Sequence, residues 1–310
     1  MTVRIITGDC REVLPTLPAA SVHCVVTSPP YYGLRSYGRN SPLGLEPRVA
    51  DYVANVVAVM REIRRVLRDD GTAWLNLGDS YANNAGFIEG AQPNRARDGL
   101  KPKDIVGVPW RVAFALQAAG WWLRQDIVWA KPNPMPESVC DRCTRAHEYI
   151  FLLAKSESYY FDAEAISEPS VTGDNRKPFA AGQVDVRGDG HDRGGGSERT
   201  NGIRDASRRN KRSVWEVATQ SFDGAHFAVF PPALILPCIL AGCPVGGTVL
   251  DPFAGAGTTG LVADRCDRNA VLIEFNAGYA ALAARRIKAD SPLFAKVESD
   301  SRIQSVATTE

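Results

Sequence analysis

The chain of 310 residues carries 36 Lys or Arg and 35 Asp or Glu, which gives a formal net charge of only +1 at pH 7. This balance neither requires nor excludes a nucleic-acid partner, because acidic residues elsewhere can offset a local basic groove. No uncharged apolar stretch approaches the roughly 20 residues of a membrane span, and seven cysteines, an odd number, argue against a disulfide framework. We therefore expect a protein of a reducing compartment that does not enter a membrane.

The first half of the chain alternates between strand-like and helix-like patterns. Short β-branched or apolar runs predict strands, and apolar residues at the i, i+3, i+4, i+7 spacing predict helices. The predicted strands are 3–7, 22–26, 72–77, 121–129 and 149–154, and the predicted helices are 49–68 and 105–119. We expect Asp69-Asp70-Gly71 to close the first of these helices. Three prolines rule out regular structure at 131–138.

Residues 167–213 differ from everything before them. They hold eight glycines, ten Lys or Arg and seven Asp or Glu but almost no apolar periodicity, so they cannot contribute much core. A basic run at 208–212 ends the segment and could either bind phosphates or simply be solvated. The same two interpretations stay open for the loops 33–38 and 83–103, which carry basic and aromatic side chains.

Regular patterns return after residue 213. A short strand at 214–217 is followed by an apolar helix over 233–241, and Pro231 and Pro232 are tolerated in its first turn. The remaining predicted strands are 246–251 and 270–274, the remaining predicted helices are 258–265 and 275–287, and the tail from Asp290 is expected to be poorly ordered. Strands that alternate with helices in this way favour an α/β fold.

Two of the predicted strand ends carry motifs. The strand 22–26 stops at Ser28-Pro29-Pro30-Tyr31, where the prolines cannot continue a strand ladder and leave fixed acceptors beside an aromatic ring. The strand 246–251 runs into the glycine-rich turn Asp251-Pro252-Phe253-Ala254-Gly255-Ala256-Gly257-Thr258-Thr259. Ligands of open α/β sheets bind beyond the carboxyl ends of the strands, so both motifs should face such a crevice. The polar residues Gly78-Asp79-Ser80-Tyr81, at the end of the predicted strand 72–77, should open onto the same crevice.

Together these motifs resemble those of the amino-group DNA methyltransferases. Their order along the chain resembles that of the beta-class, the permuted group with a Thr-Ser-Pro-Pro-Tyr motif that is common in bacteria and phages. The run from Trp129 to Asp162 extends the resemblance. It implies an α/β, Rossmann-like class I methyltransferase fold, with a mostly parallel sheet and helices on both faces. It also implies S-adenosylmethionine as cofactor, double-stranded DNA as partner, a homodimer, and the cytoplasm of a bacterium or of a phage-infected cell as location.

The resemblance also divides the chain. Residues 1–166 would form the catalytic half of the methyltransferase domain, and residues 214–290 its cofactor-binding half. The basic segment 167–213 would be the target-recognition insert, because in this motif order target recognition occupies the interval between the two motifs. Residues 291–310 would form a tail.

The expected catalytic residues are Ser28, Pro29, Pro30 and Tyr31. The amino nitrogen of a base is a poor nucleophile because its lone pair is delocalised into the ring. Ser28 Oγ and the Pro29 carbonyl can accept the amino hydrogens and favour a pyramidal nitrogen, so positioning supplies most of the catalysis. Tyr31 can stack on a base that has left the duplex, although a core aromatic is the alternative.

The expected cofactor site surrounds the glycine-rich turn. Gly255 and Gly257 let the backbone approach a ligand closely, and Glu274 stands where ribose hydroxyls need a carboxylate. Asp9 could contact the cofactor or simply cap the helix that follows it. The resemblance implies a full set of Asp9, His226, Phe230, Asp251, Phe253, Gly255, Gly257, Thr258, Glu274 and Phe275.

Cysteines suggest two rival chemistries. A carbon-5 cytosine methyltransferase needs a Pro-Cys nucleophile, but Cys238 follows Pro237 inside an apolar helix, so we interpret it as a core residue. Cys140, Cys143 and His147 include only one Cys-x-x-Cys pair, so we expect no metal site.

The base that is methylated depends on the first residue of the catalytic motif. In the resembled family, serine before Pro-Pro-Tyr is associated mainly with cytosine-N4 transfer and aspartate mainly with adenine-N6 transfer. Ser28 therefore favours a site-specific cytosine-N4 enzyme, with an adenine-N6 enzyme as the alternative. A non-catalytic DNA-binding protein on the same fold is a third interpretation, against which the two undamaged motifs argue.

Overall fold

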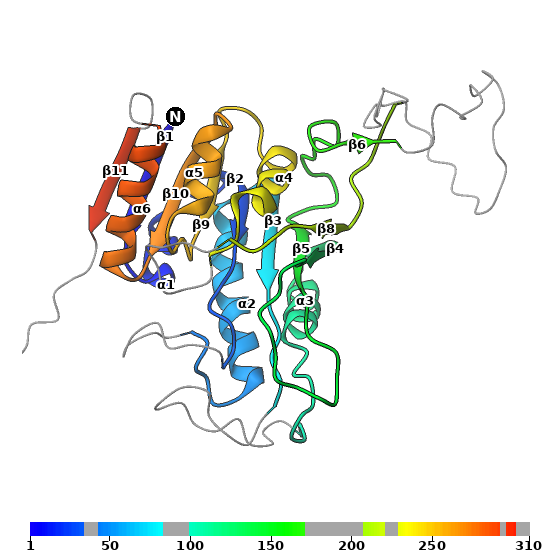
Figure 1. Cartoon of the computed structure of the whole chain (residues 1–310). Helices are drawn as coiled ribbons and strands as arrows, with labels where there is room; N and C mark the ends of the chain where they lie inside the picture. The colour runs from blue at the N-terminus through cyan, green and yellow to red at the C-terminus, as the bar shows by residue number, and fades with distance from the viewer. Residues whose placement is uncertain (34–42, 83–98, 171–206, 221–228, 292–295, 302–310) are drawn as a thin grey trace, which may run out of the picture. The chain divides into compact units, whose positions relative to one another are not determined.

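In the computed structural model the chain consists of two compact units. Figure 1 shows its helices and strands. The larger unit consists of residues 1–161 and 213–310, and the smaller one of residues 162–212, which nearly coincide with the segment predicted to be an insert. The residues that the structure describes are 1–33, 43–82, 99–170, 207–220, 229–291 and 296–301. Most of the loops 33–38 and 83–103 and of the segment 167–213 therefore lies outside the described residues.

The described part of the larger unit is built on one nine-stranded sheet with the order β11-β1-β10-β9-β2-β3-β5-β4-β8. Its strands are β1 (Thr2–Thr7), β2 (Val22–Thr27), β3 (Leu67–Leu77), β4 (Trp122–Ala130), β5 (His147–Ala154), β8 (Val214–Glu216), β9 (Thr248–Asp251), β10 (Asn269–Glu274) and β11 (Lys296–Ser301). Every neighbouring pair is parallel except the two that involve β5. The predicted mostly parallel sheet is thus confirmed, with one antiparallel strand of the kind common in large mixed sheets.

Helices cover both faces of this sheet. One face carries α1 (Cys10–Val13), the 3-10 turn η1 (Leu14–Thr16), α2 (Val49–Val66) and α3 (Val108–Ala118), and the other carries α4 (Pro232–Gly242), α5 (Thr258–Arg265) and α6 (Ala277–Asp290). Successive side chains of β2 point to opposite faces of the sheet. Val25 packs with α2 on one face, whereas the Cys24 thiol lies 3.9 Å from the Cys238 carbonyl oxygen of α4 on the other. None of the described helices is long and apolar enough to cross a membrane.

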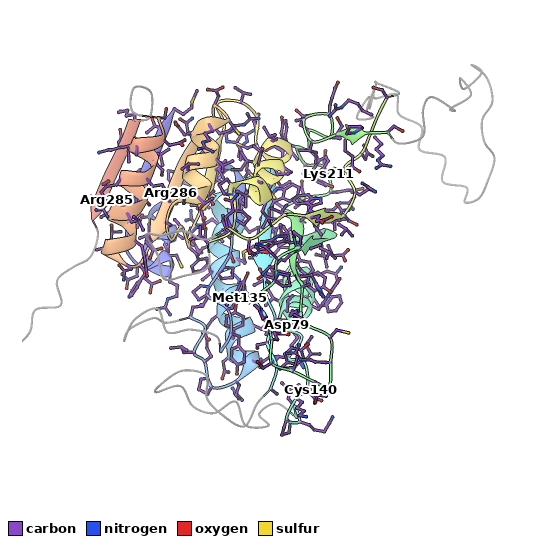
Figure 2. The ribbon with its side chains drawn as sticks, viewed as in Figure 1. Asp79, Met135, Cys140, Lys211, Arg285 and Arg286 are labelled. Atoms are coloured by element: carbon purple, nitrogen blue, oxygen red, sulfur yellow. The ribbon has the colours of Figure 1, made fainter. Side chains whose placement is uncertain are left out.

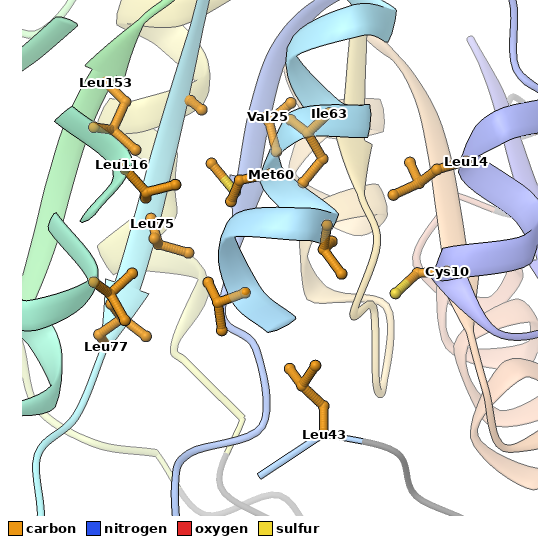
Figure 3. Close-up of a cluster of buried hydrophobic side chains, with 14 of the residues drawn as sticks. Cys10, Leu14, Val25, Leu43, Met60, Ile63, Leu75, Leu77, Leu116 and Leu153 are labelled. Carbon is orange, nitrogen blue, oxygen red and sulfur yellow. The ribbon is translucent and has the colours of Figure 1, made fainter. Parts of the chain in front are cut away.

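The apolar residues whose spacing predicts the helix α2 are those that the helix buries in the core beneath it (Figure 3). Met60 and Ile63, three residues apart and so on one side of the helix, belong to the same buried cluster as Val25 and Leu75 of the sheet. Each fully buried side chain of this size contributes about 1.5–3 kcal/mol relative to exposure. The apolar stripe of α2 is therefore the main anchor of this helix on the sheet.

Residues 67–71 differ from the prediction. β3 begins at Leu67, directly after α2, so Asp69-Asp70-Gly71 lies within the strand and does not form a separate turn. The pairing of β2 with β3 shifts register between Val22 and Cys24, which accommodates the additional residues as an irregularity. A Cβ atom on Gly71 would stand only 2.9 Å from the His23 carbonyl oxygen. The lack of a side chain at Gly71 therefore lets β3 lie close to β2 at this point.

The tail after Asp290 is more regular than predicted. β11 pairs in parallel with β1 at the edge of the sheet, and Arg4 forms an ion pair of 3.3 Å with Asp300. Charged and small polar side chains dominate this strand, which suits a sheet edge but hides the strand from a search for apolar runs.

The described part of the smaller unit contains an antiparallel pair formed by β6 (Glu168–Pro169) and β7 (Arg208–Arg209). Glu168 forms ion pairs of 3.2 Å with Arg209 and 2.6 Å with Arg212. Part of the basic run 208–212 is therefore neutralised within the unit.

Gly242 lets α4 approach the sheet closely, and the substitution Gly242→Ala tests that contact. A Cβ atom there would lie 2.6 Å from Trp74 Nε1 and 2.7 Å from Thr72 Oγ1, inside a packed core. We expect the free energy of unfolding, measured in urea, to fall by about 1–3 kcal/mol. Ala233→Ser, which adds one atom at an exposed position of the same helix, should change it little. Equal stability of the two variants would contradict this packing.

Candidate active site

The carboxyl ends of the central strands open onto a cavity of about 420 Å³. β2 and β9 are parallel neighbours, so the two motifs that follow them reach the same cavity although they are more than 200 residues apart. The predicted site residues that line it are Asp9, Ser28, Pro29, Pro30, Tyr31, Phe230, Phe253, Gly255, Thr258, Glu274 and Phe275. The structure therefore brings together all four predicted catalytic residues and most of the predicted cofactor residues.

Asp251 does not line this cavity. Its side chain is buried beneath the glycine-rich turn, where Oδ1 accepts hydrogen bonds from Thr27 Oγ1 at 2.7 Å and the Phe253 amide at 3.0 Å, and Oδ2 accepts one from Thr259 Oγ1 at 2.6 Å. Burial raises the pKa of Asp251 to about 6, and the three hydrogen bonds oppose that rise. Asp251 thus ties the turn to β2 and leaves ligand contact to its neighbours.

The two predicted glycines have different roles. Gly255 lines the cavity with φ at +51°, and a Cβ atom on it would meet nothing within 4 Å, so its backbone is open to a ligand. Gly257 does not line the cavity. Its φ is +75°, and a Cβ atom on it would stand 2.7 Å from the Ala283 methyl group, so this glycine lets α6 pack closely behind the turn.

Glu274 and Asp9 both line the cavity from strand ends, and both also hold the backbone. Glu274 accepts hydrogen bonds from the Gly255 and Asn276 amides, each at 2.8 Å, and burial raises its pKa. Asp9 caps α1 by accepting a hydrogen bond from the Arg11 amide at 2.9 Å. The capping role is therefore shown, and the same residue also borders the cavity. His226 lies outside the described residues.

The catalytic turn is held from several sides. The Tyr52 hydroxyl donates a hydrogen bond of 2.9 Å to the Pro30 carbonyl. The Tyr31 ring lies so close to the backbone of Gly78 that a Cβ atom there would stand 2.5 Å from the ring. Tyr31 is half-buried and lines the cavity, so it is not a plain core aromatic.

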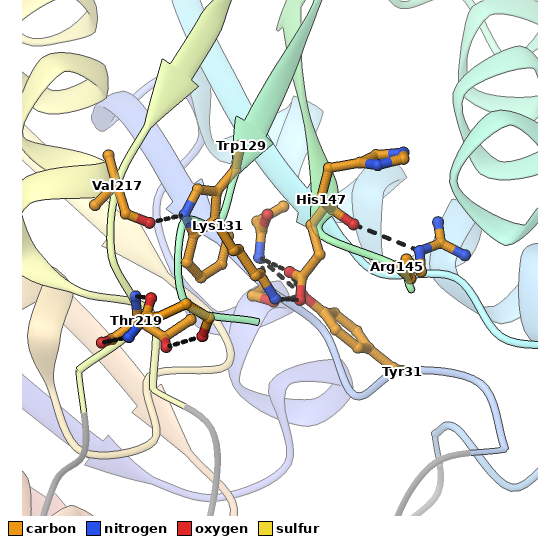
Figure 4. Close-up of polar contacts among 11 residues, drawn as sticks. Tyr31, Trp129, Lys131, Arg145, His147, Val217 and Thr219 are labelled. Carbon is orange, nitrogen blue, oxygen red and sulfur yellow. Dashed lines mark hydrogen bonds and ion pairs between the residues drawn. The ribbon is translucent and has the colours of Figure 1, made fainter. Parts of the chain in front are cut away.

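A polar cluster that sequence reasoning missed surrounds the Tyr31 hydroxyl (Figure 4). Tyr31 donates a hydrogen bond of 2.6 Å to Glu148 Oε2, and Asn76 Nδ2 donates to both, at 2.8 Å to the hydroxyl and 3.1 Å to Glu148. The ammonium group of Lys131 forms an ion pair with Glu148 and lies 4.3 Å from the centre of the Trp129 ring. The other four residues of this cluster also line the cavity, and the signal for its polar members in the sequence is no more than a polar side chain at the end of an apolar strand.

The residues Gly78-Asp79-Ser80-Tyr81 are predicted to open onto the same crevice, but none of them lines the cavity, and Asp79 serves a helix instead. Its carboxylate caps α3 by accepting from the Gly107 amide at 3.2 Å and the Val108 amide at 3.0 Å, and it lies 3.8 Å from Arg145 (Asp79 is labelled in Figure 2). Gly107 has a φ of +74° and no side chain that could cap, so the first turn of the helix takes its acceptor from the end of β3.

The cysteines considered for the two rival chemistries, Cys140, Cys143 and Cys238, do not line the cavity. Cys238 is fully buried in α4, which confirms the interpretation as a core residue. Cys140 and Cys143 are exposed free thiols (Cys140 is labelled in Figure 2). Within the described ranges no three His, Cys, Asp or Glu side chains gather as a metal site would require.

The cavity fits S-adenosylmethionine, the cofactor that the sequence resemblance implies. A carboxylate at the end of β10, Glu274, can accept from ribose hydroxyls, and the Phe275 ring beside it is 41% exposed and can meet an adenine face. The open backbone at Gly255 leaves room for the chain of the ligand to pass closely. A cavity of this size also lies within the range of sites for small molecules.

The raised pKa of Asp251 predicts how stability should depend on pH. A carboxyl group whose pKa rises from 3.8 unfolded to about 6 folded favours the native state fully below its unfolded pKa, and this contribution is lost as the pH rises through about 6. Asp251→Asn cannot ionise but can still accept from Thr27 and donate to the Thr259 hydroxyl. Urea unfolding between about pH 4 and pH 7 should therefore show wild-type stability falling relative to this variant. Asp126→Asn, at an exposed position of β4, is the control that should keep the wild-type profile, and equal pH profiles for Asp251→Asn and wild type would contradict the assignment.

Known proteins resemble the chain over nearly its whole length. A family model described as N6/N4 DNA methylase matches residues 22–285. The type II methyltransferase M.SmaI of Serratia marcescens is 46% identical over 294 residues, which cover 92% of this chain and 90% of that protein. The type II methyltransferase M.Cfr9I of Citrobacter freundii is 46% identical over 91% of this chain and 87% of its own length.

Solved structures show the same fold. A putative DNA modification methylase from Thermus thermophilus, complexed with S-adenosyl-L-methionine, is 25% identical with a TM-score of 0.61 and covers 97% of this chain and 99% of that one. The PvuII DNA methyltransferase, described as cytosine-N4-specific, is 18% identical with a TM-score of 0.63 and covers 96% of each chain. The chain therefore belongs to the N6/N4 family of DNA methylases, whose cofactor is S-adenosylmethionine.

Proposed function

We propose that this protein methylates the exocyclic N4 of cytosine at a specific site in double-stranded DNA and is the modification enzyme of a type II restriction-modification system. The observation that carries the choice of base is Ser28 at the head of the catalytic motif, within the cavity. The names of the type II relatives support the choice of system. The permuted motif order, Ser28 before Asp251, supports membership of the beta-class.

The chain's own residues would act mainly by positioning. Bound S-adenosylmethionine supplies a methyl group on a positively charged sulfur. Ser28 Oγ and the Pro29 carbonyl would accept the amino hydrogens of the target base and turn the nitrogen lone pair toward that methyl group. Tyr52 and Gly78 fix the turn and the Tyr31 ring, so the acceptors need no rearrangement when the base arrives.

Tyr31 would receive the target base. Leaving the duplex costs the base a few kcal/mol, and stacking on an aromatic ring offsets about 1–3 kcal/mol of that. The ring is backed by Gly78 and held at its hydroxyl, so little side-chain entropy is lost on stacking.

The predicted cofactor residues would have two roles: some would contact the ligand, and others would support the glycine-rich turn. Asp9, Phe230, Phe253, Gly255, Thr258, Glu274 and Phe275 line the cavity and would contact the ligand, whereas Asp251 and Gly257 would hold the turn in shape. His226 stays a prediction. In this arrangement residues 1–166 supply the catalytic half and 214–290 the cofactor half, the insert 167–213 reads the DNA sequence, and a homodimer is the expected assembly.

The first test is the product. Unmethylated DNA incubated with the protein and S-adenosylmethionine should yield N4-methylcytosine by mass spectrometry of its nucleosides. Ser28→Ala removes the amino-group acceptor, and we expect its rate to fall at least about 100-fold. N6-methyladenine as the product would overturn the choice of base and keep the class of enzyme. DNA left unmethylated by the wild-type protein would overturn the proposal as a whole.

The second test concerns Glu274. Its replacement in Glu274→Ala removes a charged acceptor, so we expect the dissociation constant for S-adenosylmethionine, measured by calorimetry, to rise at least about tenfold. As the pH falls, protonation of Glu274 should weaken the binding of S-adenosylmethionine to the wild-type protein. Because burial raises the pKa of Glu274, this weakening should begin at a higher pH than it would with an ordinary carboxylate. Glu274→Ala should lose this pH dependence. Glu216→Gln, exposed on β8, is the matched control. Unchanged affinity of Glu274→Ala would exclude this contact.

A further inference from the structure

The hydroxyl groups at the catalytic turn form a directed chain that ends on a carboxylate. Ser28 Oγ donates to the Tyr31 hydroxyl at 3.4 Å, and the Tyr31 hydroxyl donates to Glu148 Oε2 at 2.6 Å. A carboxylate can only accept, so the proton of Tyr31 must point toward Glu148. The Asn76 amide supports this direction, since its Nδ2 donates to the Tyr31 hydroxyl at 2.8 Å and reaches Ser28 Oγ at 3.5 Å.

The direction of this chain has a chemical consequence for Ser28. A hydroxyl carries one proton and two lone pairs. With its proton turned toward Tyr31, Ser28 Oγ presents lone pairs to whatever enters the cavity. The arrangement therefore suits a substrate that brings hydrogens, such as an amino group, and it leaves a route along which a proton can depart.

We propose that Glu148 is the terminal acceptor of the proton that the target amine loses on methylation, through Ser28 and Tyr31; this rests on the proposed function. The bond from nitrogen to carbon forms as the bond from carbon to sulfur breaks, and the electron pair of the broken bond stays on sulfur. The nitrogen, now positive, gives one proton to Ser28 Oγ. Ser28 passes its own proton to Tyr31, and Tyr31 passes its proton to Glu148, which ends as a neutral carboxylic acid.

The surroundings of Glu148 fit this role. The side chain is 14% exposed, so a proton delivered there has left the reacting centre without crossing open solvent, and Lys131, 17% exposed, balances its charge before the transfer. Trp129 pairs with Glu148 across β4 and β5, which brings Lys131, just beyond the end of β4, beside the carboxylate. A methylated ring amine that bears a positive charge is strongly acidic, so an ion-paired carboxylate is a sufficient base.

Among the described residues, few other titratable groups face Glu148. Lys131 and Tyr31 contact it directly, and His147 precedes it on β5. Burial lowers the pKa of His147, so its imidazole stays neutral at pH 7 and above.

The test compares Glu148→Gln, Tyr31→Phe and the control Glu216→Gln in single-turnover methyl transfer to unmethylated DNA. We expect Glu148→Gln to lower the rate about 10²- to 10⁴-fold, the range of general base catalysis, with binding of S-adenosylmethionine and DNA changed less than about threefold. Tyr31→Phe keeps the ring but breaks the chain, so it should lower the rate without weakening DNA binding. Glu216→Gln should keep the wild-type rate.

Chemical rescue separates proton transfer from a merely structural role. Formate added to Glu148→Ala should restore part of the lost rate, and the remaining rate of Glu148→Gln should increase with pH. A rate within about threefold of wild type for both Glu148→Gln and Tyr31→Phe would overturn the proposal, as would a loss confined to affinity with no rescue by formate. A wild-type product of N6-methyladenine would correct the base while the same variants still decide the role of Glu148. A wild-type protein that methylates neither base would overturn both proposals.

Discussion

The hydrogen bond from Thr27 to Asp251 joins the ends of two strands across 224 residues of chain, and the site depends on it. Both side chains are buried, and the Thr27 hydroxyl is one of three donors that satisfy the Asp251 carboxylate. The bond fixes the end of β2 against the end of β9, and with them the proline turn and the glycine-rich turn. Neighbouring strand ends, and not the order of motifs along the chain, therefore determine which groups meet in the cavity.

Much of the fold and part of the site could be predicted because the signals are local. Two prolines after an apolar run mark where β2 ends, and positive φ angles favour glycine at Gly255 and Gly257. Asn76 and Glu148 gave no such signal. The role of a polar residue at a strand end can be predicted only when the neighbours of that strand in the sheet are known. The carboxylate of Asp79 shows the opposite error, because a polar strand end need not face the ligand crevice and can serve a helix instead.

The errors in secondary structure have a common cause. Asp69-Asp70-Gly71 has the composition of a turn, and the strand β11 has the composition of a polar tail. The first nevertheless lies within β3, between residues that pair with β2, and the second pairs with β1. Backbone pairing satisfies amide groups whatever the side chains are, and it depends on partners far away in the sequence. Local propensity is a weak guide where tertiary pairing decides.

The strands β6 and β7 pair with each other and so hold together the two ends of the long segment between them. Closing a longer segment at such a point costs little, since a doubling of loop length adds only about 0.6 kcal/mol of closure entropy. The segment can therefore be exchanged for one of different length and composition while the sheet keeps its strand order. In the proposed function this segment reads the DNA, so exchanging it would change the sequence that is read while the chemistry of the cavity is inherited intact.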